Sequence, residues 1–150
     1  MQLSADWVVG FVDAGDCFHV SVNRHRSMTI GFQVLPEFVV VQHCRDRQIL
    51  MALKRYFGAG VVRSNHGDRD CLRIRKFDAL RQVCDFFLKH PLKTKKNSDF
   101  RKFRRIVMLM DQRRHLKLEG LKEIVQVALQ MNSTDRPALE EVWRELVHRG

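Results

Sequence analysis

Near the N-terminus the chain reads Trp7-Val8-Val9-Gly10-Phe11-Val12-Asp13-Ala14-Gly15-Asp16-Cys17-Phe18, an apolar segment that contains two aspartates. Its apolar residues recur at helical spacing and Ser4 precedes them as a candidate N-cap, so we predict a helix over residues 4–14. Gly10 and Ala14 lie four residues apart and form a stripe with little side chain, which a second helix can approach closely. Because aspartates follow this stripe, the pattern predicts acidic groups where two such helices meet.

Later segments with alternating apolar and polar residues predict an antiparallel sheet. The strands are expected at residues 17–23, 28–35, 61–65 and 71–76. Pro36-Glu37 is expected to interrupt the sheet, because proline donates no ladder hydrogen bond, and residues 38–42 continue as a short extended piece. Helical spacing recurs at residues 46–57, 78–90, 100–110, 118–131 and 137–146. Ser98 or Asp99 is the expected cap of the third of these helices, and Thr134 or Asp135 is the expected cap of the last.

The order helix, two strands, helix, two strands, helix (αββαββα), followed by C-terminal helices, defines the predicted fold class. It is α+β: a four-stranded antiparallel sheet with helices on one face and a polar, basic opposite face. A length of 150 residues with 45% hydrophobic content suits a single compact domain over residues 1–150.

The charge of the chain favours a polyanionic partner. Twenty-seven Lys and Arg against 17 Asp and Glu give a formal net charge of +10, which is typical of nucleic-acid binding. The four cysteines show no paired spacing, so neither a zinc site nor a disulfide framework is expected. No apolar run reaches the ~18 residues of a membrane span, and the N-terminus carries no pattern typical of a secretion signal, so no membrane partner is expected.

Residues 10–14, Gly-Phe-Val-Asp-Ala, resemble the signature of the LAGLIDADG homing endonucleases. The signature continues with an acid and then glycine, whereas this chain has Gly15 and then Asp16. The resemblance implies a single LAGLIDADG-type domain of the intron-encoded kind, which hydrolyses phosphodiester bonds of double-stranded DNA at a long, palindromic or nearly palindromic site with Mg²⁺ as cofactor. Members with one motif are homodimers, so the resemblance implies one acidic metal ligand per subunit and a dimer interface at Trp7, Gly10, Phe11 and Ala14.

The resemblance also implies the residues of the active site. The metal site falls on Ala14, Gly15 and Asp16, because Mg²⁺ takes carboxylate and carbonyl oxygens. The catalytic residues are Asp16, Gln42 and Lys95. Lys95 belongs to the segment 91–100, which resembles the family's lysine-bearing loop; an ordinary solvated basic loop is the alternative. Asp13 is the poorer ligand candidate and is expected to form hydrogen bonds near the end of its helix.

The polar face of the sheet is the predicted DNA-binding surface, because a two-stranded ribbon fits the major groove. The predicted contacts on the sheet are His19, Ser21, Asn23, Gln33, Arg63, Asn65, Arg73 and Arg75, with the turn residues His25 and Arg26 beside them and Lys93 and Lys96 from the lysine-bearing segment. Arg73 and Arg75 are the candidates for guanine, since arginine can bond O6 and N7 together. The alternative is that these are solvated strand faces.

The order Gly15-Asp16 leaves the function open between alternatives. Strand parity groups Asp16 with the core residues Phe18 and Val20, pointing away from DNA, unless Gly15 breaks the parity and turns Asp16 back. A DNA-binding homodimer with impaired or no cleavage, and an RNA-splicing maturase that binds structured RNA, are therefore alternatives to an active nuclease. The family implies an intracellular location, in an organelle (chloroplast or mitochondrion) or the prokaryotic cytoplasm.

Overall fold

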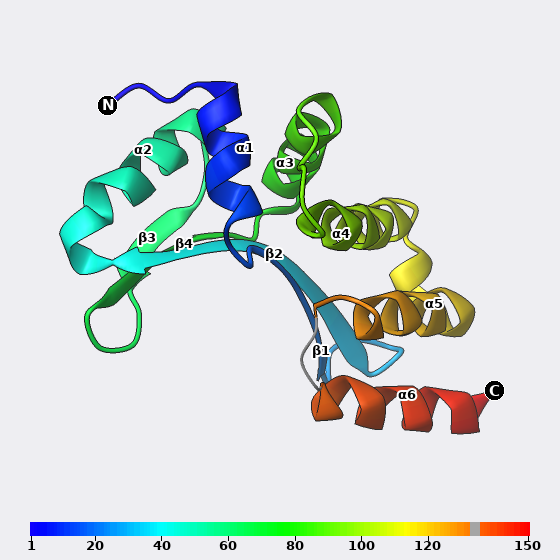
Figure 1. The fold of residues 1–150 in the computed structure, drawn as a ribbon. Coiled ribbons are helices and arrows are strands. Elements are labelled where there is room, and N and C mark those ends of the chain that lie inside the picture. The colour runs from blue at the N-terminus through cyan, green and yellow to red at the C-terminus, as the bar shows by residue number, and fades with distance from the viewer. Residues whose placement is uncertain (133–135) are drawn as a thin grey trace. The chain divides into compact units, whose positions relative to one another are not determined.

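The structure, a computed structural model, describes residues 1–132 and 136–150 (Figure 1). Its helices are α1 (Ala5–Asp13), α2 (Arg47–Phe57), α3 (Phe77–Lys89), α4 (Lys96–Asp111), α5 (Leu118–Leu129) and α6 (Pro137–Arg149). Its strands are β1 (Phe18–Arg24), β2 (Phe32–His43), β3 (Val61–Ser64) and β4 (Arg69–Ile74). The strands form one sheet in the order β1-β2-β4-β3, in which β2 and β3 both pair with β4 in antiparallel fashion. The predicted α+β class and the αββαββα order are confirmed.

The chain divides into two compact units. The first unit comprises residues 1–19 and 37–100, and the second comprises residues 20–36 and 101–150. Strands β1 and β2 and helix α4 each contribute residues to both units. Among the described residues, no helix combines the length and the apolar character that crossing a membrane requires.

Helix α1 begins at the predicted cap, because the Ser4 Oγ accepts a hydrogen bond of 3.2 Å from the backbone N–H of Trp7. Its valines Val8, Val9 and Val12 are buried. This side of the helix faces the interior of the first unit, and the positions between the valines face outward.

The core of the first unit is built around phenylalanines. Phe18 of β1 lies 5.5 Å from Phe38 of β2 and 5.6 Å from Phe87 of α3, measured between ring centroids. Helices α1, α2 and α3 lie on one side of the β2–β4–β3 part of the sheet (Figure 1). The opposite face of these strands is left uncovered within this unit, which is the arrangement that the alternation in the sequence predicted.

The predicted interruption at Pro36 is wrong, because β2 runs without a break through this residue. Pairing of β2 with β4 begins only at Phe38, so the missing N–H of Pro36 costs no hydrogen bond to β4. The predicted strand start at Met28 is also wrong. Residues 25–31 form a turn, closed by a 2.9 Å hydrogen bond from the N–H of His25 to the carbonyl of Gly31.

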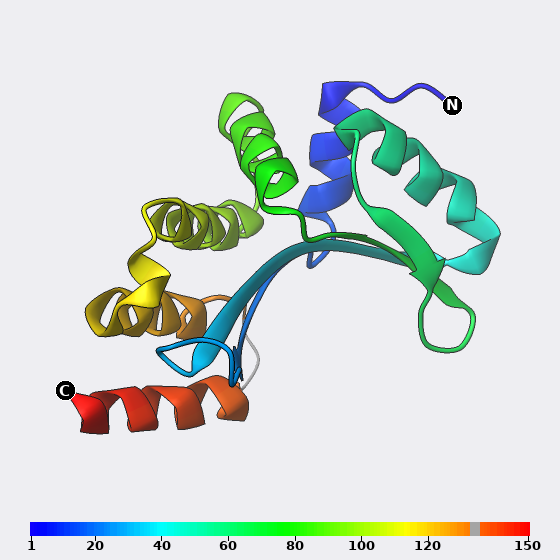
Figure 2. The same cartoon turned by 180° about the vertical axis from the view of Figure 1, so that it is seen from behind.

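The second unit joins the β1–β2 hairpin to helix α6 (Figure 2). Arg136 donates to the carbonyl oxygen of Val20 at 2.6 Å, and Arg149 donates to that of Ile30 at 2.7 Å. Pro137 occupies the start of α6, as predicted, because its fixed φ and missing N–H suit this position. The predicted caps Thr134 and Asp135 lie outside the described residues.

Candidate active site and nucleic-acid interface

Asp13, the last residue of α1, fixes the position of the lysine loop, which we define as residues 91–95. Its Oδ2 accepts the backbone N–H of Lys93 at 2.7 Å. Its Oδ1 accepts the backbone N–H and the hydroxyl of Thr94, at 3.1 and 2.8 Å. The expectation that Asp13 forms hydrogen bonds near the helix end is confirmed, and the loop is held directly at that end.

The same contacts keep the Asp13 carboxylate ionised. Burial raises its pKa, but the hydrogen bonds from Lys93 and Thr94 and the positive charge of Lys93 lower it by more. The pKa of Asp13 therefore lies below its ordinary value. An ionised acceptor strengthens each of the three hydrogen bonds that hold the loop.

Helix α4 begins at Lys96, so Ser98 and Asp99 do not precede the helix as the predicted caps would. Thr94 starts the turn instead, because its carbonyl accepts the N–H of Asn97 at 3.0 Å and its hydroxyl accepts the N–H of Lys96 at 3.2 Å. Asp99 is buried in the first turn of α4. Lys96 is thereby fixed at the helix start, next to the end of α1.

The side chain of Asp16 is 56% exposed, and its Oδ1 lies 3.5 Å from Lys96 Nζ. Its backbone carbonyl accepts a 2.9 Å hydrogen bond from His19 Nε2. Cys17 and Phe18 are both buried, so the strand alternation begins only at Phe18. Of the two alternatives for Asp16, the one in which strand parity groups its side chain with the core is therefore wrong, because Asp16 precedes the alternating segment.

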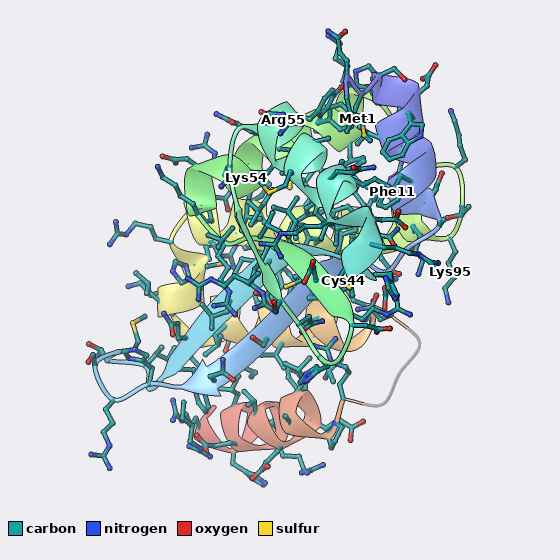
Figure 3. All side chains as sticks on the ribbon, turned by 90° about the vertical axis from the view of Figure 1, so that its left-hand side faces the viewer. Met1, Phe11, Cys44, Lys54, Arg55 and Lys95 are labelled. Carbon is teal, nitrogen blue, oxygen red and sulfur yellow. The ribbon has the colours of Figure 1, made fainter. Side chains whose placement is uncertain are left out.

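Asp16 shares a hollow of about 440 Å³ with the predicted catalytic residue Gln42. Ala14 and Gly15 also line this hollow. Lys95 is exposed and precedes α4; it lies in the loop near the end of α1 (Figure 3). The structure thus brings the proposed acid, the glutamine and the lysine loop to one place in the first unit.

Among the residues that line this hollow, Asp16 is the one that carries a carboxylate. Within residues 1–132 and 136–150, no group of three or more His, Cys, Asp and Glu is arranged to hold a metal ion. The exposed Asp16 carboxylate is a ligand of the type that Mg²⁺ prefers. This chain therefore fits a divalent ion only as one contributor to a site that other oxygen ligands complete.

The predicted guanine readers Arg73 and Arg75 share one carboxylate, that of Glu37. Arg75 Nε donates to Glu37 Oε2 at 2.6 Å, and Arg73 Nε lies 3.2 Å from the same oxygen. Glu37 was not among the predicted site residues, because Pro36-Glu37 was expected to interrupt the sheet. Continuing the alternation through Pro36 would have placed Glu37 on the polar face.

Other predicted DNA contacts lie on either unit. In the first unit, Arg63 lines a hollow of about 350 Å³ together with Arg73 and Arg75, and Asn65 is exposed in the β3–β4 turn. Lys93 is exposed in the lysine loop. In the second unit, Ser21 and Asn23 line a hollow of about 220 Å³.

The hairpin turn of the second unit carries two more of these predicted contacts. The His25 Nδ1 is buried, with no hydrogen-bond partner among the described residues. Arg26 is exposed, and Gln33 at the start of β2 is half-buried.

The outward side of α1 is apolar and open. Trp7, which is 40% exposed, stacks on Phe11 with 4.9 Å between ring centroids. A Cβ built on Gly10 would meet nothing within 4 Å, and Ala14 is exposed. The four residues predicted to form a dimer interface therefore lie on one accessible helix face, at i, i+3, i+4 and i+7.

Two curated proteins similar to this chain are named as probable intron-encoded endonucleases of the fungus Neurospora crassa. The "Probable intron-encoded endonuclease 3" of Neurospora crassa is 30% identical over 131 residues, which cover 84% of this chain and 24% of that protein. The "Probable intron-encoded endonuclease 2" of the same species is 29% identical over 148 residues, covering 97% of this chain and 33% of that protein. The chain thus spans about a quarter to a third of the length of these relatives.

Solved structures and a family model also match endonucleases. The homing endonuclease I-TnaI is 55% identical, with a TM-score of 0.95 over 97% of this chain and 99% of that chain. The LAGLIDADG homing endonuclease I-SmaMI bound to cleaved DNA is 28% identical, with a TM-score of 0.90 over 97% of this chain and 49% of that chain. The family model described as "LAGLIDADG endonuclease" matches residues 8–107. The chain therefore belongs to the LAGLIDADG endonuclease family.

Proposed function

We propose that the protein is a site-specific DNA endonuclease that acts as a homodimer, with Asp16 of each subunit in a shared active site. One observation carries the proposal. Helix α1 buries its valines and exposes the apolar face formed by Trp7, Gly10, Phe11 and Ala14, and Asp16 follows this face directly. Joining two copies along the face would bring two carboxylates to one place.

The size of the matched DNA-bound endonuclease supports the dimer. This chain corresponds to 49% of I-SmaMI, which was solved with cleaved DNA, so one copy has the extent of about half of that protein. A second copy related by a two-fold axis would supply the other half. Such a dimer reads a palindromic or nearly palindromic site, because its two halves present the same residues.

The residues at the end of α1 suit a divalent ion of the Mg²⁺ type. Asp16 supplies an exposed carboxylate, and Ala14 and Gly15, whose backbone carbonyls would be the further oxygen ligands, line the same hollow. The contact of Asp16 with Lys96 is long, at 3.5 Å, so a cation can replace the lysine as its partner. When bound, the ion neutralises charge on the attacking and leaving oxygens of the phosphodiester.

The remaining roles follow from placement and charge. Lys95 and Lys96 would bring positive charge to the scissile phosphate, and Lys93 would contact a neighbouring phosphate. Gln42 lines the hollow beside Asp16 and would orient a water there by hydrogen bonding. The sheet residues of the first and second units, named above, would contact bases and phosphates.

The test is a cleavage selection from a randomised palindromic DNA library with Mg²⁺, with Ca²⁺ as a condition expected to permit binding without cutting. We expect a defined consensus and double-strand cleavage by the unaltered protein. Asp16→Asn should abolish cutting and preserve binding. Asp6→Asn, which removes an exposed carboxylate from the same helix, is the matched control and should cut normally.

The same experiment tests whether the order Gly15-Asp16 permits DNA cleavage. A Cβ at Gly15 would have its closest contact with Cys17 Sγ at 3.4 Å, so the double variant Gly15→Asp, Asp16→Gly can be accommodated. If the unaltered protein binds selectively but does not cut, and the double variant gains cutting, the protein is a DNA-binding homodimer without cleavage. If Asp16→Asn cuts DNA at the normal rate, the assignment of Asp16 to the active site is wrong.

A maturase is separated by its preferred polyanion. The affinities for duplex DNA and for structured RNA are compared at the same salt concentration, because both polymers attract a basic protein non-specifically. For an endonuclease we expect tighter binding to the DNA site, where the specific contacts are made. Tighter binding to the RNA would support the splicing function instead. An intron-encoded, organellar or prokaryotic origin accords with this proposal and stays a prediction.

A further inference from the structure

Glu37 places a carboxylate among arginines on the uncovered face of the first unit. In the β2–β4 register, Phe38 faces Ile74, so Glu37 and Arg75 form the next facing pair. Arg73, two residues before Arg75, projects from the same face of β4. One carboxylate therefore lies within reach of two guanidinium groups that leave the sheet side by side.

Glu37 Oε2 contacts both arginines, Arg75 by a hydrogen bond and Arg73 by an ion pair. Arg75 Nε forms a 2.6 Å hydrogen bond with Glu37 Oε2. Arg73 Nε lies 3.2 Å from that oxygen, but its direction is poor, and this buried atom has no hydrogen-bond partner among the described residues. In both arginines the terminal Nη groups, which can bind guanine O6 and N7, are not needed for these contacts.

Stability is a minor consequence of this cluster. The arginine side chains are 41% and 57% exposed, and ion pairs at such exposed positions add little to the stability of a fold. A carboxylate on a basic face also weakens the attraction of that face for phosphates. The larger consequence is geometric, because a held guanidinium loses less side-chain freedom when it binds a base.

We propose that Glu37 is a positioning residue that holds Arg73 and Arg75 as one guanine-reading unit. The inference rests on the proposed DNA recognition. Glu37 acts through the arginines: its side chain is only 17% exposed, and the oxygen that it presents is already occupied. The unit opens on the 350 Å³ hollow, whose lining includes Arg63 and Lys76, so a base edge that enters meets arginines already placed.

The experiment compares binding specificity in Ca²⁺, where cleavage does not contribute. The unaltered protein, Glu37→Gln and Glu123→Gln are each taken through selection from a randomised palindromic library. Glu123 is the matched control, because its carboxylate is also shared by two arginines, Arg105 and Arg114, but on α4 and the turn before α5. Thermal unfolding of each variant checks that it is folded.

We expect guanine at one or more positions of the consensus for the unaltered protein. Replacing those guanines with 7-deazaguanine, which lacks N7, should weaken its binding. Glu37→Gln should lose about tenfold of the preference for guanine at these positions, the lower part of the range for one bidentate pair, and should bind unrelated duplex more tightly. A uniform loss of affinity would instead indicate a purely structural role and would overturn the proposal.

Two further variants keep the proposal testable if Glu37→Gln does not fold. Glu37→Asp retains the charge and should keep the preference in part. Arg75→Lys should lose the guanine preference while Glu37 is unchanged, because lysine cannot bond O6 and N7 in the same fixed geometry.

The failures of the two proposals differ. Selective binding by the unaltered protein, with the same guanine preference in Glu37→Gln, overturns the role of Glu37 alone. Equal profiles for Glu37→Gln and Glu123→Gln do the same. Absence of any sequence-selective binding by the unaltered protein overturns the proposed function and, with it, this inference.

Discussion

The carboxylate of Asp13 and the hydroxyl of Thr94 are joined by a 2.8 Å hydrogen bond, although 81 residues separate them in the chain. Asp16 follows Asp13 by three residues and Lys96 follows Thr94 by two, and these two side chains meet as well. The proposed acid and the lysines thus owe their proximity to a contact between residues that need not touch the substrate. Asp13 is best understood as a positioning residue.

Asp13→Asn should reduce the free energy of unfolding by about 1 kcal/mol at neutral pH, because charge-assisted hydrogen bonds to a partly exposed carboxylate are lost. The pKa of folded Asp13 lies below its ordinary value of 3.8, so its stabilisation is complete above that pH. The stabilisation is then lost as the pH falls through the lower, folded pKa. Urea unfolding at stepped pH should show the two proteins converging in acid, and a difference that stays constant to pH 2 would contradict the assignment. Thr94→Ser retains the hydroxyl and is the control.

Gly10→Leu should prevent dimer formation without unfolding the subunit. The position is exposed and a Cβ there meets nothing within 4 Å, so the fold of one chain accommodates the side chain, whereas close helix packing does not. Sedimentation of the protein with its selected DNA should show a dimer for the unaltered chain and a monomer for Gly10→Leu. A leucine variant that still dimerises would place the interface elsewhere.

Gly120→Ala should destabilise the protein by about 1–3 kcal/mol, the usual range for overpacking. An ideal Cβ at Gly120 would lie 1.9 Å from the carbonyl oxygen of Arg114, so the turn before α5 has to move. Gly10→Ala is the matched control and should stabilise the isolated subunit by about 0.5–1 kcal/mol, because alanine is the better helix former at an open position. Chemical unfolding of both variants measures the contrast, and equal effects would be contrary to expectation.

Cys44 should be the first thiol to react with iodoacetamide at pH 8. It is exposed, whereas Cys17 is buried, and burial together with the negative charge of Asp16 raises the pKa of Cys17 to about 12, against a smaller lowering by Lys96. Little Cys17 thiolate is therefore present, and the thiolate is the reactive form. Peptide mass spectrometry should find the modification at Cys44, and Cys44→Ser should suppress native-state labelling. Labelling of Cys17 at a similar rate would show that its surroundings are open.

Local signals predicted most of the fold because local interactions determine it. The cap at Ser4, the valine side of α1 and the alternation Phe18, Val20, Val22 were each readable from spacing, and each is confirmed. The continuation of β2 through Pro36 was not readable in this way, because a proline disrupts a strand only where its missing N–H would pair. That depends on where β4 begins to pair with β2, which no short-range pattern reveals.

The candidate site was partly readable for the same reason. The lysine loop was recognised by resemblance, but its attachment through Asp13 is a contact between distant residues. The exposure of Asp16 follows from the start of the alternation at Phe18. A start one residue earlier would change which residues share a face, so this exposure was hard to predict. Glu37 was not predicted as a site residue, because the sheet was wrongly expected to be interrupted at Pro36.

The second unit is assembled from two separated parts of the chain, with all of residues 37–100 between them. During synthesis, the hairpin of residues 20–36 leaves the ribosome long before Arg136, which directly precedes α6, and Arg149, which ends it. These two arginines bind the Val20 and Ile30 carbonyls of the hairpin. Until the later helices emerge, this hairpin is therefore incompletely packed and accessible to chaperones and proteases. A nonsense mutation ahead of α6 would leave its backbone without these arginines, even where the residues around Asp16 had already been translated.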